Sequence, residues 1–173
     1  ESLGAKFVEV ASEETESAET AGGYAKEMSD DYKRRQSELI HETLKTQDIA
    51  ICAALIPGRT APTLITAQMV ADMKPGSVIV DLATETGGNC ELSEYGKVVV
   101  KHGVNIVAHA NVPGRVAVDA SALYARNLLN FLTPMIDVDN AVFKVDWDDE
   151  VFAGACVTRD GQVVHPMLVD GDG

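Results

Sequence analysis

The sequence predicts a doubly wound α/β domain, in which helices cover both faces of a mostly parallel β-sheet. Short apolar runs typical of buried strands alternate along the chain with stretches whose apolar residues recur at helical spacing. Two of these runs, residues 48–55 and 77–83, are continuous, as strands covered on both faces require. Strands that alternate with helices in this way build a parallel sheet.

The first elements are a short strand and a long loop. Gly4 suits a helix C-cap, and residues 5–10 are predicted to form a strand. Residues 11–29 have no period and are rich in Glu, Thr and Ala, so we expect a loop there. Tyr24 and Met28 flank a glycine pair in this loop and suit a mobile lid over a ligand. The alternative is an exposed loop that covers nothing.

A helix is predicted to follow, because Ser29 or Asp30 suits its N-cap and apolar residues recur up to about Thr46. Its inner stripe consists of residues three or four positions apart, namely Tyr32, Gln36, Leu39, Ile40 and Leu44. Gln36 is the polar member of this stripe. It lies either at the boundary of the core or with its amide facing a cleft.

The remaining elements continue the alternation of strands and helices up to residue 136. In chain order they are a strand at 48–55, a helix at 66–73, a strand at 77–83, strands at 98–100 and 104–108, and an amphipathic helix at 119–133. After Pro134 the pattern changes to short alternating pieces at 141–145, 151–157 and 162–164. We therefore predict a Rossmann-like domain over residues 1–136. Residues 137–173 would form a small antiparallel appendage or a return toward an adjoining domain.

The composition restricts the possible partners. The 27 acidic and 14 basic residues among 173 give a net charge of −13, which repels nucleic-acid backbones and anionic lipid head groups. The longest apolar run, residues 49–56, is far shorter than the roughly 18 residues that span a bilayer. Three widely spaced cysteines favour a reducing, intracellular setting. We expect no nucleic-acid partner and no direct membrane insertion.

Ligands of open parallel sheets bind beyond the carboxyl ends of the strands, so the loops there are candidate sites. Glycine occurs in all four such loops, at residues 22–28, 53–59, 84–90 and 109–115. A glycine lets the backbone approach a ligand closely, although each loop taken singly can be only a turn. Asp81 and Glu85, four residues apart at a strand end, either hydrogen-bond a ribose or an amide, or cap the following structure.

The sequence offers no catalytic side chain or metal site. The four histidines lack metal-ligand spacing, no G-x-S-x-G occurs, and Cys90 is more typical of an inert thiol than of a nucleophile. The sequence also contains no G-x-G-x-x-G, the phosphate-binding turn that follows the first strand of a dinucleotide-binding fold. We expect the domain to be truncated at its N-terminus, with that turn upstream of Glu1.

Several motifs together resemble one family. They are Ala21-Gly22-Gly23-Tyr24-Ala25-Lys26-Glu27-Met28, Ala54-Leu55-Ile56-Pro57-Gly58, the segment 74–83, Gly87-Gly88-Asn89, Asn111-Val112-Pro113, and the segments 127–132 and 156–161. This combination is similar to the alpha subunit of proton-translocating NAD(P) transhydrogenase, a family related to alanine dehydrogenase. The similarity covers nearly the whole chain.

The resemblance implies an NAD(H)-binding domain that lacks its first βαβ part. Gly23, Gln36 and Leu55 match positions that contact NAD in this family, and the segment around Tyr24 matches a mobile loop over NAD. The full set of expected cofactor-binding residues is Gly23, Tyr24, Met28, Gln36, Ala54, Leu55, Pro57, Glu85 and Asn89.

The resemblance further implies direct hydride transfer from NADH to NADP⁺, with NADP(H) bound by a partner component and protons moving through a membrane-spanning component. No side-chain acid or nucleophile is then needed. A homodimer, located in the cytoplasm and peripheral to the inner (plasma) membrane through its complex, is expected.

Two alternatives stay open. The first is an alanine-dehydrogenase-like amino-acid oxidoreductase, in which Glu85 would serve as the acid or base. The second is a binding or assembly module without activity.

Overall fold

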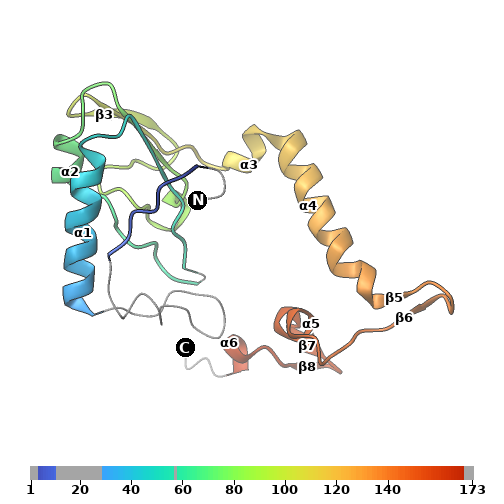
Figure 1. Cartoon of the computed structure of the whole chain (residues 1–173). Helices are drawn as coiled ribbons and strands as arrows, with labels where there is room; N and C mark the ends of the chain where they lie inside the picture. The colour runs from blue at the N-terminus through green and yellow to red at the C-terminus, as the bar shows by residue number, and fades with distance from the viewer. Residues whose placement is uncertain (1–3, 11–28, 57, 170–173) are drawn as a thin grey trace. The chain divides into compact units, whose positions relative to one another are not determined.

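The computed structural model describes residues 4–10, 29–56 and 58–169 (Figure 1). These residues belong to two compact units, residues 1–112 and residues 113–173. The sequence predicts the domain boundary near residue 136, whereas the structure divides the chain after residue 112. The long helix predicted at 119–133 therefore lies in the second unit and not in the first. No helix in the described ranges has the length and apolarity needed to cross a membrane.

A four-stranded sheet forms the centre of the first unit. Its strands are β1 (Ile49–Cys52), β2 (Val78–Asp81), β3 (Val98–Lys101) and β4 (Val104–Val107), in the spatial order β1-β2-β4-β3. The first three strands of that order are parallel, whereas β3 runs antiparallel to β4. The carboxyl ends of β1, β2 and β4 therefore lie at one edge of the sheet, as the alternating pattern predicts.

Two helices of the first unit begin at side-chain caps. The helix α1 (Asp30–Leu44) begins after Ser29, whose hydroxyl accepts a hydrogen bond from the Tyr32 N–H at 3.2 Å. This confirms the predicted start of the helix. The shorter α2 (Ala67–Ala71) is capped in the same way by Thr66. Of the predicted inner stripe of α1, Tyr32 and Leu44 are buried, whereas Gln36 is exposed.

One face of the sheet carries the core of the first unit. Ile79 and Ile106, at paired positions on β2 and β4, are fully buried. They pack with α2 and the end of α1, and the cluster consists of Leu44, Cys52, Ile65, Met69, Val70, Met73, Ile79, Cys90, Val104 and Ile106. Successive strand residues point to opposite faces, so these strand residues all lie on the same side. Figure 1 shows α1 and α2 beside the sheet.

The opposite face of the sheet is apolar but open among the described residues. Ile51 and Val98 are 69% and 52% exposed, and the register places them in one row across the sheet with Val80 and Val107. The expectation that β1 is covered on both faces is therefore wrong for Ile51. The reason is that the described helices that contribute to the core cluster, α1 and α2, pack on one face.

Two sequence expectations, about residues 5–10 and 151–157, are wrong. Residues 5–10 form no strand, because no described strand lies beside them to complete a ladder. Residues 151–157 were expected to be extended but fall largely in helix α5 (Glu150–Ala155). The carboxylate of Asp149 caps this helix by accepting hydrogen bonds from the N–H groups of Val151 and Phe152, and this cap outweighs the β-propensity of the run.

The second unit consists of helices and two small hairpins. The helix α3 (Val112–Arg115) leads into α4 (Ala117–Leu132), which confirms the helix predicted at 119–133. The hairpins are β5 (Ile136–Asp137) with β6 (Val142–Phe143) and β7 (Thr158–Arg159) with β8 (Gln162–Val163), followed by α6 (Pro166–Val169). Phe131 on α4 and Phe152 on α5 meet edge to face with ring centroids 5.2 Å apart. The hairpins confirm the predicted antiparallel appendage.

Candidate functional site at the carboxyl edge of the sheet

Asp81, the last residue of β2, organises the loop that follows this strand. Its carboxylate is fully buried and accepts hydrogen bonds from the N–H groups of Ala83 (3.0 Å), Asn89 (2.9 Å) and Cys90 (3.0 Å), and from the Ser93 hydroxyl (2.7 Å). These donors offset the cost of burying a charge, and they wrap residues 83–93 around it. Of the two roles left open for Asp81, the structure supports the cap of the following loop.

Asn89 joins this loop to the loop after β1. Its fully buried side chain accepts a hydrogen bond from the Ala54 N–H at 2.9 Å and donates to the carbonyls of Ala54 (3.0 Å) and Pro62 (2.8 Å). Its own carbonyl accepts from the N–H groups of Leu64 and Ile65. A single amide thus fixes the backbone on both sides of the segment 54–62.

Glu85 joins the same loop to the loop after β4. Its Oε1 atom accepts a hydrogen bond of 3.0 Å from the backbone N–H of Asn111, whose φ angle is +48°. Glu85 lies in the single helical turn η2 (Thr84–Thr86) directly after β2. The loops after β1, β2 and β4 are therefore cross-linked at one edge, as the strand-end argument predicts.

Two glycines of the central loop are required by the packing of the protein itself. Gly87 has φ +109°, and a Cβ atom there would lie 2.8 Å from the Thr60 methyl group. Gly88 has φ +86°, and its Cβ would lie 2.9 Å from the Asp81 carboxylate. The sequence interpretation, in which glycine admits a ligand, does not account for these two positions. They let the loop close onto its neighbours.

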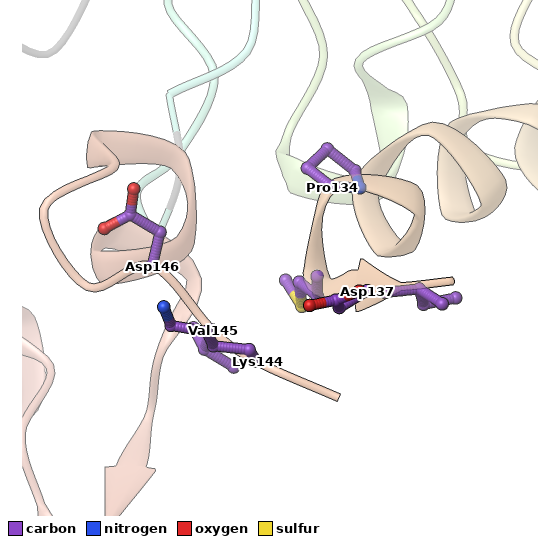
Figure 2. A pocket seen from close by; sticks show the side chains of 7 residues that line it. Pro134, Asp137, Lys144, Val145 and Asp146 are labelled. Atoms are coloured by element: carbon purple, nitrogen blue, oxygen red, sulfur yellow. The ribbon is translucent and has the colours of Figure 1, made fainter. Parts of the chain in front are cut away.

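A shallow hollow of about 600 Å³ opens beside these cross-links. Gly58, Arg59, Thr60 and Thr86 line it. The Ala61 N–H donates to the Thr86 carbonyl at 2.8 Å, which fixes the two walls relative to each other. A second hollow, of about 360 Å³, lies in the second unit between the segments 134–137 and 144–146. Figure 2 shows Asp137 and Asp146 around it; both carboxylates already accept backbone N–H bonds.

The structure places the expected cofactor-binding residues in three groups. Ala54, Glu85 and Asn89 belong to the cross-linked loops, and Leu55 beside them is 55% exposed. Gln36 lies on the exposed surface of α1, and no hydrogen bond joins it to these loops within the described ranges. Gly23, Tyr24, Met28 and Pro57 lie outside the residues that the structure describes.

The thiols near the site are unreactive in character. Burial, together with the Asp81 carboxylate, raises the pKa of Cys52 to about 11, and burial also raises the pKa of Cys90. Both sulfurs are therefore protonated at neutral pH, which agrees with the sequence interpretation of Cys90. Within the described ranges, no group of His, Cys, Asp and Glu could hold a metal ion.

His109 is a feature that the sequence argument missed. It follows β4 at the same edge, and its Nδ1 atom is buried without a hydrogen-bond partner among the described residues. In the sequence, His109 is assessed only as a candidate metal ligand. A buried, unpaired ring nitrogen depends on tertiary packing, so no local pattern could have revealed it.

The comparisons with known proteins agree on one family. The model of the family "Alanine dehydrogenase/PNT, C-terminal domain" matches residues 1–166. An NAD(P) transhydrogenase alpha subunit of Rhodospirillum rubrum is 60% identical over 168 residues, which cover 97% of this chain and 44% of that protein. An alanine dehydrogenase of Halomonas elongata is 33% identical over 141 residues, or 79% of this chain and 38% of that protein.

Solved structures give the same result. A transhydrogenase from Sinorhizobium meliloti matches with a TM-score of 0.66 at 45% identity, over 94% of this chain and 41% of that one. An L-alanine dehydrogenase matches with a TM-score of 0.57 at 28% identity, over 78% of this chain and 37% of that one. The predicted Rossmann-like α/β fold is thereby confirmed. The chain spans less than half the length of these relatives.

Proposed function

Because the chain belongs to the alanine dehydrogenase/PNT C-terminal domain family, we propose that it is the NAD(H)-binding part of a proton-translocating transhydrogenase. In this role it positions NADH for direct hydride transfer to NADP⁺ held by a partner component. The 60% identity to a transhydrogenase alpha subunit, against 33% to an alanine dehydrogenase, supports this choice between the two related activities.

One observation carries the proposal, namely the cross-linking of three loops at the carboxyl edge of the sheet by Asn89 and Glu85. This edge is where open α/β sheets bind nucleotides. Hydride transfer requires two rings to be held at a fixed distance with water excluded, and a rigid backbone edge serves that purpose.

The residues at this edge fit a dinucleotide. Leu55 and Ile56 are 55% and 44% exposed directly after β1, so they offer an apolar surface to a flat ring. The backbone of Ala54 is held by Asn89, which acts through this position because its own side chain is buried and fully bonded. Gly23, Tyr24, Met28, Gln36 and Pro57 complete the proposed set by the family resemblance.

In this function the chain contributes orientation rather than acid–base chemistry. The nicotinamide ring supplies the hydride when it is bound. Asn89 fixes the backbone at Ala54 and Pro62, and so holds the loop beside the nicotinamide ring in place. The apolar pair Leu55 and Ile56 excludes water from one side of the ring. None of these steps needs a proton held on a side chain.

The assembly is proposed along the same lines. The relatives are named as subunits, which supports the presence of partner components. By the family resemblance, one partner component would bind NADP(H) and another would span the membrane. The chain would act as a homodimer in the cytoplasm, attached to the inner (plasma) membrane through that complex.

The test measures binding and transfer separately. Quenching of NADH fluorescence by the full chain reports binding, and hydride exchange after addition of a transhydrogenase NADP(H)-binding component reports function. We expect both signals. Exchange absent despite NADH binding would leave the alanine-dehydrogenase-like and assembly-module alternatives, and absence of both signals would overturn the proposal.

The alternative function is an alanine-dehydrogenase-like oxidoreductase, which the 28% identical solved structure supports. The two functions differ in what they require of Glu85. As a transhydrogenase residue, Glu85 only holds the Asn111 N–H, and a glutamine retains an oxygen acceptor there. We therefore expect Glu85→Gln to keep hydride exchange within about threefold. Loss of nearly all activity with unchanged NADH affinity would favour the amino-acid oxidoreductase.

A further inference from the structure

Arg59, which lines the hollow beside the site, is a cation without an acidic partner among the described residues. Elsewhere in the first unit, Arg34 pairs with Asp31 at 2.7 Å and Lys74 with Asp48 at 3.0 Å. The guanidinium of Arg59 forms no ion pair or hydrogen bond with any residue that the structure describes. Arg59 is exposed, as is Arg126, which has no ion pair among the described residues either, but Arg59 lines a hollow and Arg126 does not line the hollows described above. In a chain with 27 acidic and 14 basic residues, a cation placed in a hollow favours a ligand of opposite charge.

The groups around Arg59 are hydrogen-bond donors suited to an anion. The Thr60 hydroxyl donates no hydrogen bond within the described ranges, whereas the Thr86 hydroxyl is occupied by the Ala83 carbonyl at 3.1 Å. The Arg59 N–H is bonded to the Ile56 carbonyl, but those of Gly58 and Thr60 have no such partner among the described residues. A guanidinium fork beside a free hydroxyl and free N–H groups matches the oxygens of a phosphate.

The hollow is held in shape by contacts that do not use these donors. Thr60 packs its methyl group toward Gly87, and the Ala61 N–H bonds the Thr86 carbonyl. A volume of about 600 Å³ is within the usual range for small-molecule sites. We propose that Arg59 and Thr60 form a subsite for a phosphate group, which belongs either to the bound dinucleotide or to free phosphate. The first of these sources depends on the proposed function.

The first arm of the test uses inorganic diphosphate as the probe. Calorimetric titration of the full chain is compared with Arg59→Gln and with Arg126→Gln, a matched loss of one charge on exposed α4. We expect Arg59→Gln to weaken diphosphate binding about tenfold, the usual effect of one charge-assisted contact, and Arg126→Gln to change it less than twofold. Equal affinities of the two variants, or no binding by the wild type, would overturn the subsite.

Two further variants separate geometry from charge. Arg59→Lys keeps the charge but loses the planar fork, so we expect an intermediate loss of diphosphate affinity. Thr60→Val removes the hydroxyl and keeps the methyl group that faces Gly87, so a loss of affinity with an unchanged unfolding midpoint supports the donor role. Wild-type affinity in Thr60→Val would overturn the role of Thr60.

The second arm assigns the source of the phosphate with NADH as the probe. A tenfold loss of NADH affinity in Arg59→Gln places a phosphate of the dinucleotide in the subsite. Unchanged NADH affinity, with diphosphate binding still lost, assigns the subsite to free phosphate. Arg59-dependent diphosphate binding without any NADH binding would overturn the proposed function and leave the subsite standing. NADH binding without diphosphate binding would overturn the subsite and leave the proposed function standing.

Discussion

Asn89 shows how a single side chain can determine the geometry of a site that it does not line. Its amide bonds both backbone groups of Ala54 and the Pro62 carbonyl from a fully buried position. An apolar or acidic replacement leaves the half-buried carbonyl oxygens of Ala54 and Pro62 without their donors from Asn89. Each unpaired buried group costs about 1–3 kcal/mol.

We expect Asn89→Asp to lower the free energy of unfolding by about 2–4 kcal/mol, because a carboxylate faces the carbonyls of Ala54 and Pro62. NADH affinity should fall as well, since the loop after β1 is no longer fixed. Asn105→Asp on β4 is the control, because its amide makes only a 3.5 Å contact to the Ser77 carbonyl. Denaturant titration and NADH quenching measure both effects. Equal stability of the two variants would contradict the role given to Asn89.

The start of β3 depends on an ion pair that responds to pH. Glu94 accepts hydrogen bonds from Lys97 at 2.9 Å and lies 2.9 Å from the Lys101 ammonium. These contacts, the Lys97 bond first, lower the pKa of Glu94 from 4.5 to about 2. Glu94 thus links the turn before β3 to Lys101, the last residue of β3.

Because the folded pKa of Glu94 is depressed, its stabilisation is fully present above pH 4.5 and is lost as the pH falls toward 2. The denaturant midpoint of unfolding should therefore be higher for the wild type than for Glu94→Gln at pH 7. This difference in midpoint should shrink as the pH falls from 4.5 to 2. Denaturant titrations across this range test the expectation. A difference that does not depend on pH would contradict the ion pair as its cause.

The two faces of the sheet make a second prediction at the scale of the element. Ile79 is fully buried on β2, whereas Ile51 on β1 is 69% exposed. We expect Ile79→Ala to lower the free energy of unfolding by about 2–5 kcal/mol. The matched change Ile51→Ala should cost less than about 1 kcal/mol. Equal losses in denaturant titrations would mean that the open face is covered in solution.

At the scale of the whole molecule, the proposed function assigns the ligand to the first compact unit. Binding that favours the native state adds about 2.7 kcal/mol at a ligand concentration a hundredfold above the Kd. The added stability should be concentrated where the loops are cross-linked.

We expect NADH to slow amide hydrogen exchange in residues 53–62 and 83–93 more than in residues 113–169. Exchange followed by mass spectrometry with and without NADH measures this directly. An adenosine control, which lacks phosphates and nicotinamide, should protect these segments less. Protection confined to residues 113–169 would contradict the location of the site.

The sequence by itself determined the parallel strands, the start of α1 at its Ser29 cap, the helix α4 and the meeting of the strand-end loops at one edge of the sheet. These follow from apolar periodicity and capping residues, which are local. Only the tertiary structure decided that Asn89 and Glu85 join the loops, that Gly87 and Gly88 are packing requirements, and that one face of the sheet is open. It also left residues 5–10 without a strand. Such outcomes depend on which distant groups meet, and a linear pattern does not contain that information.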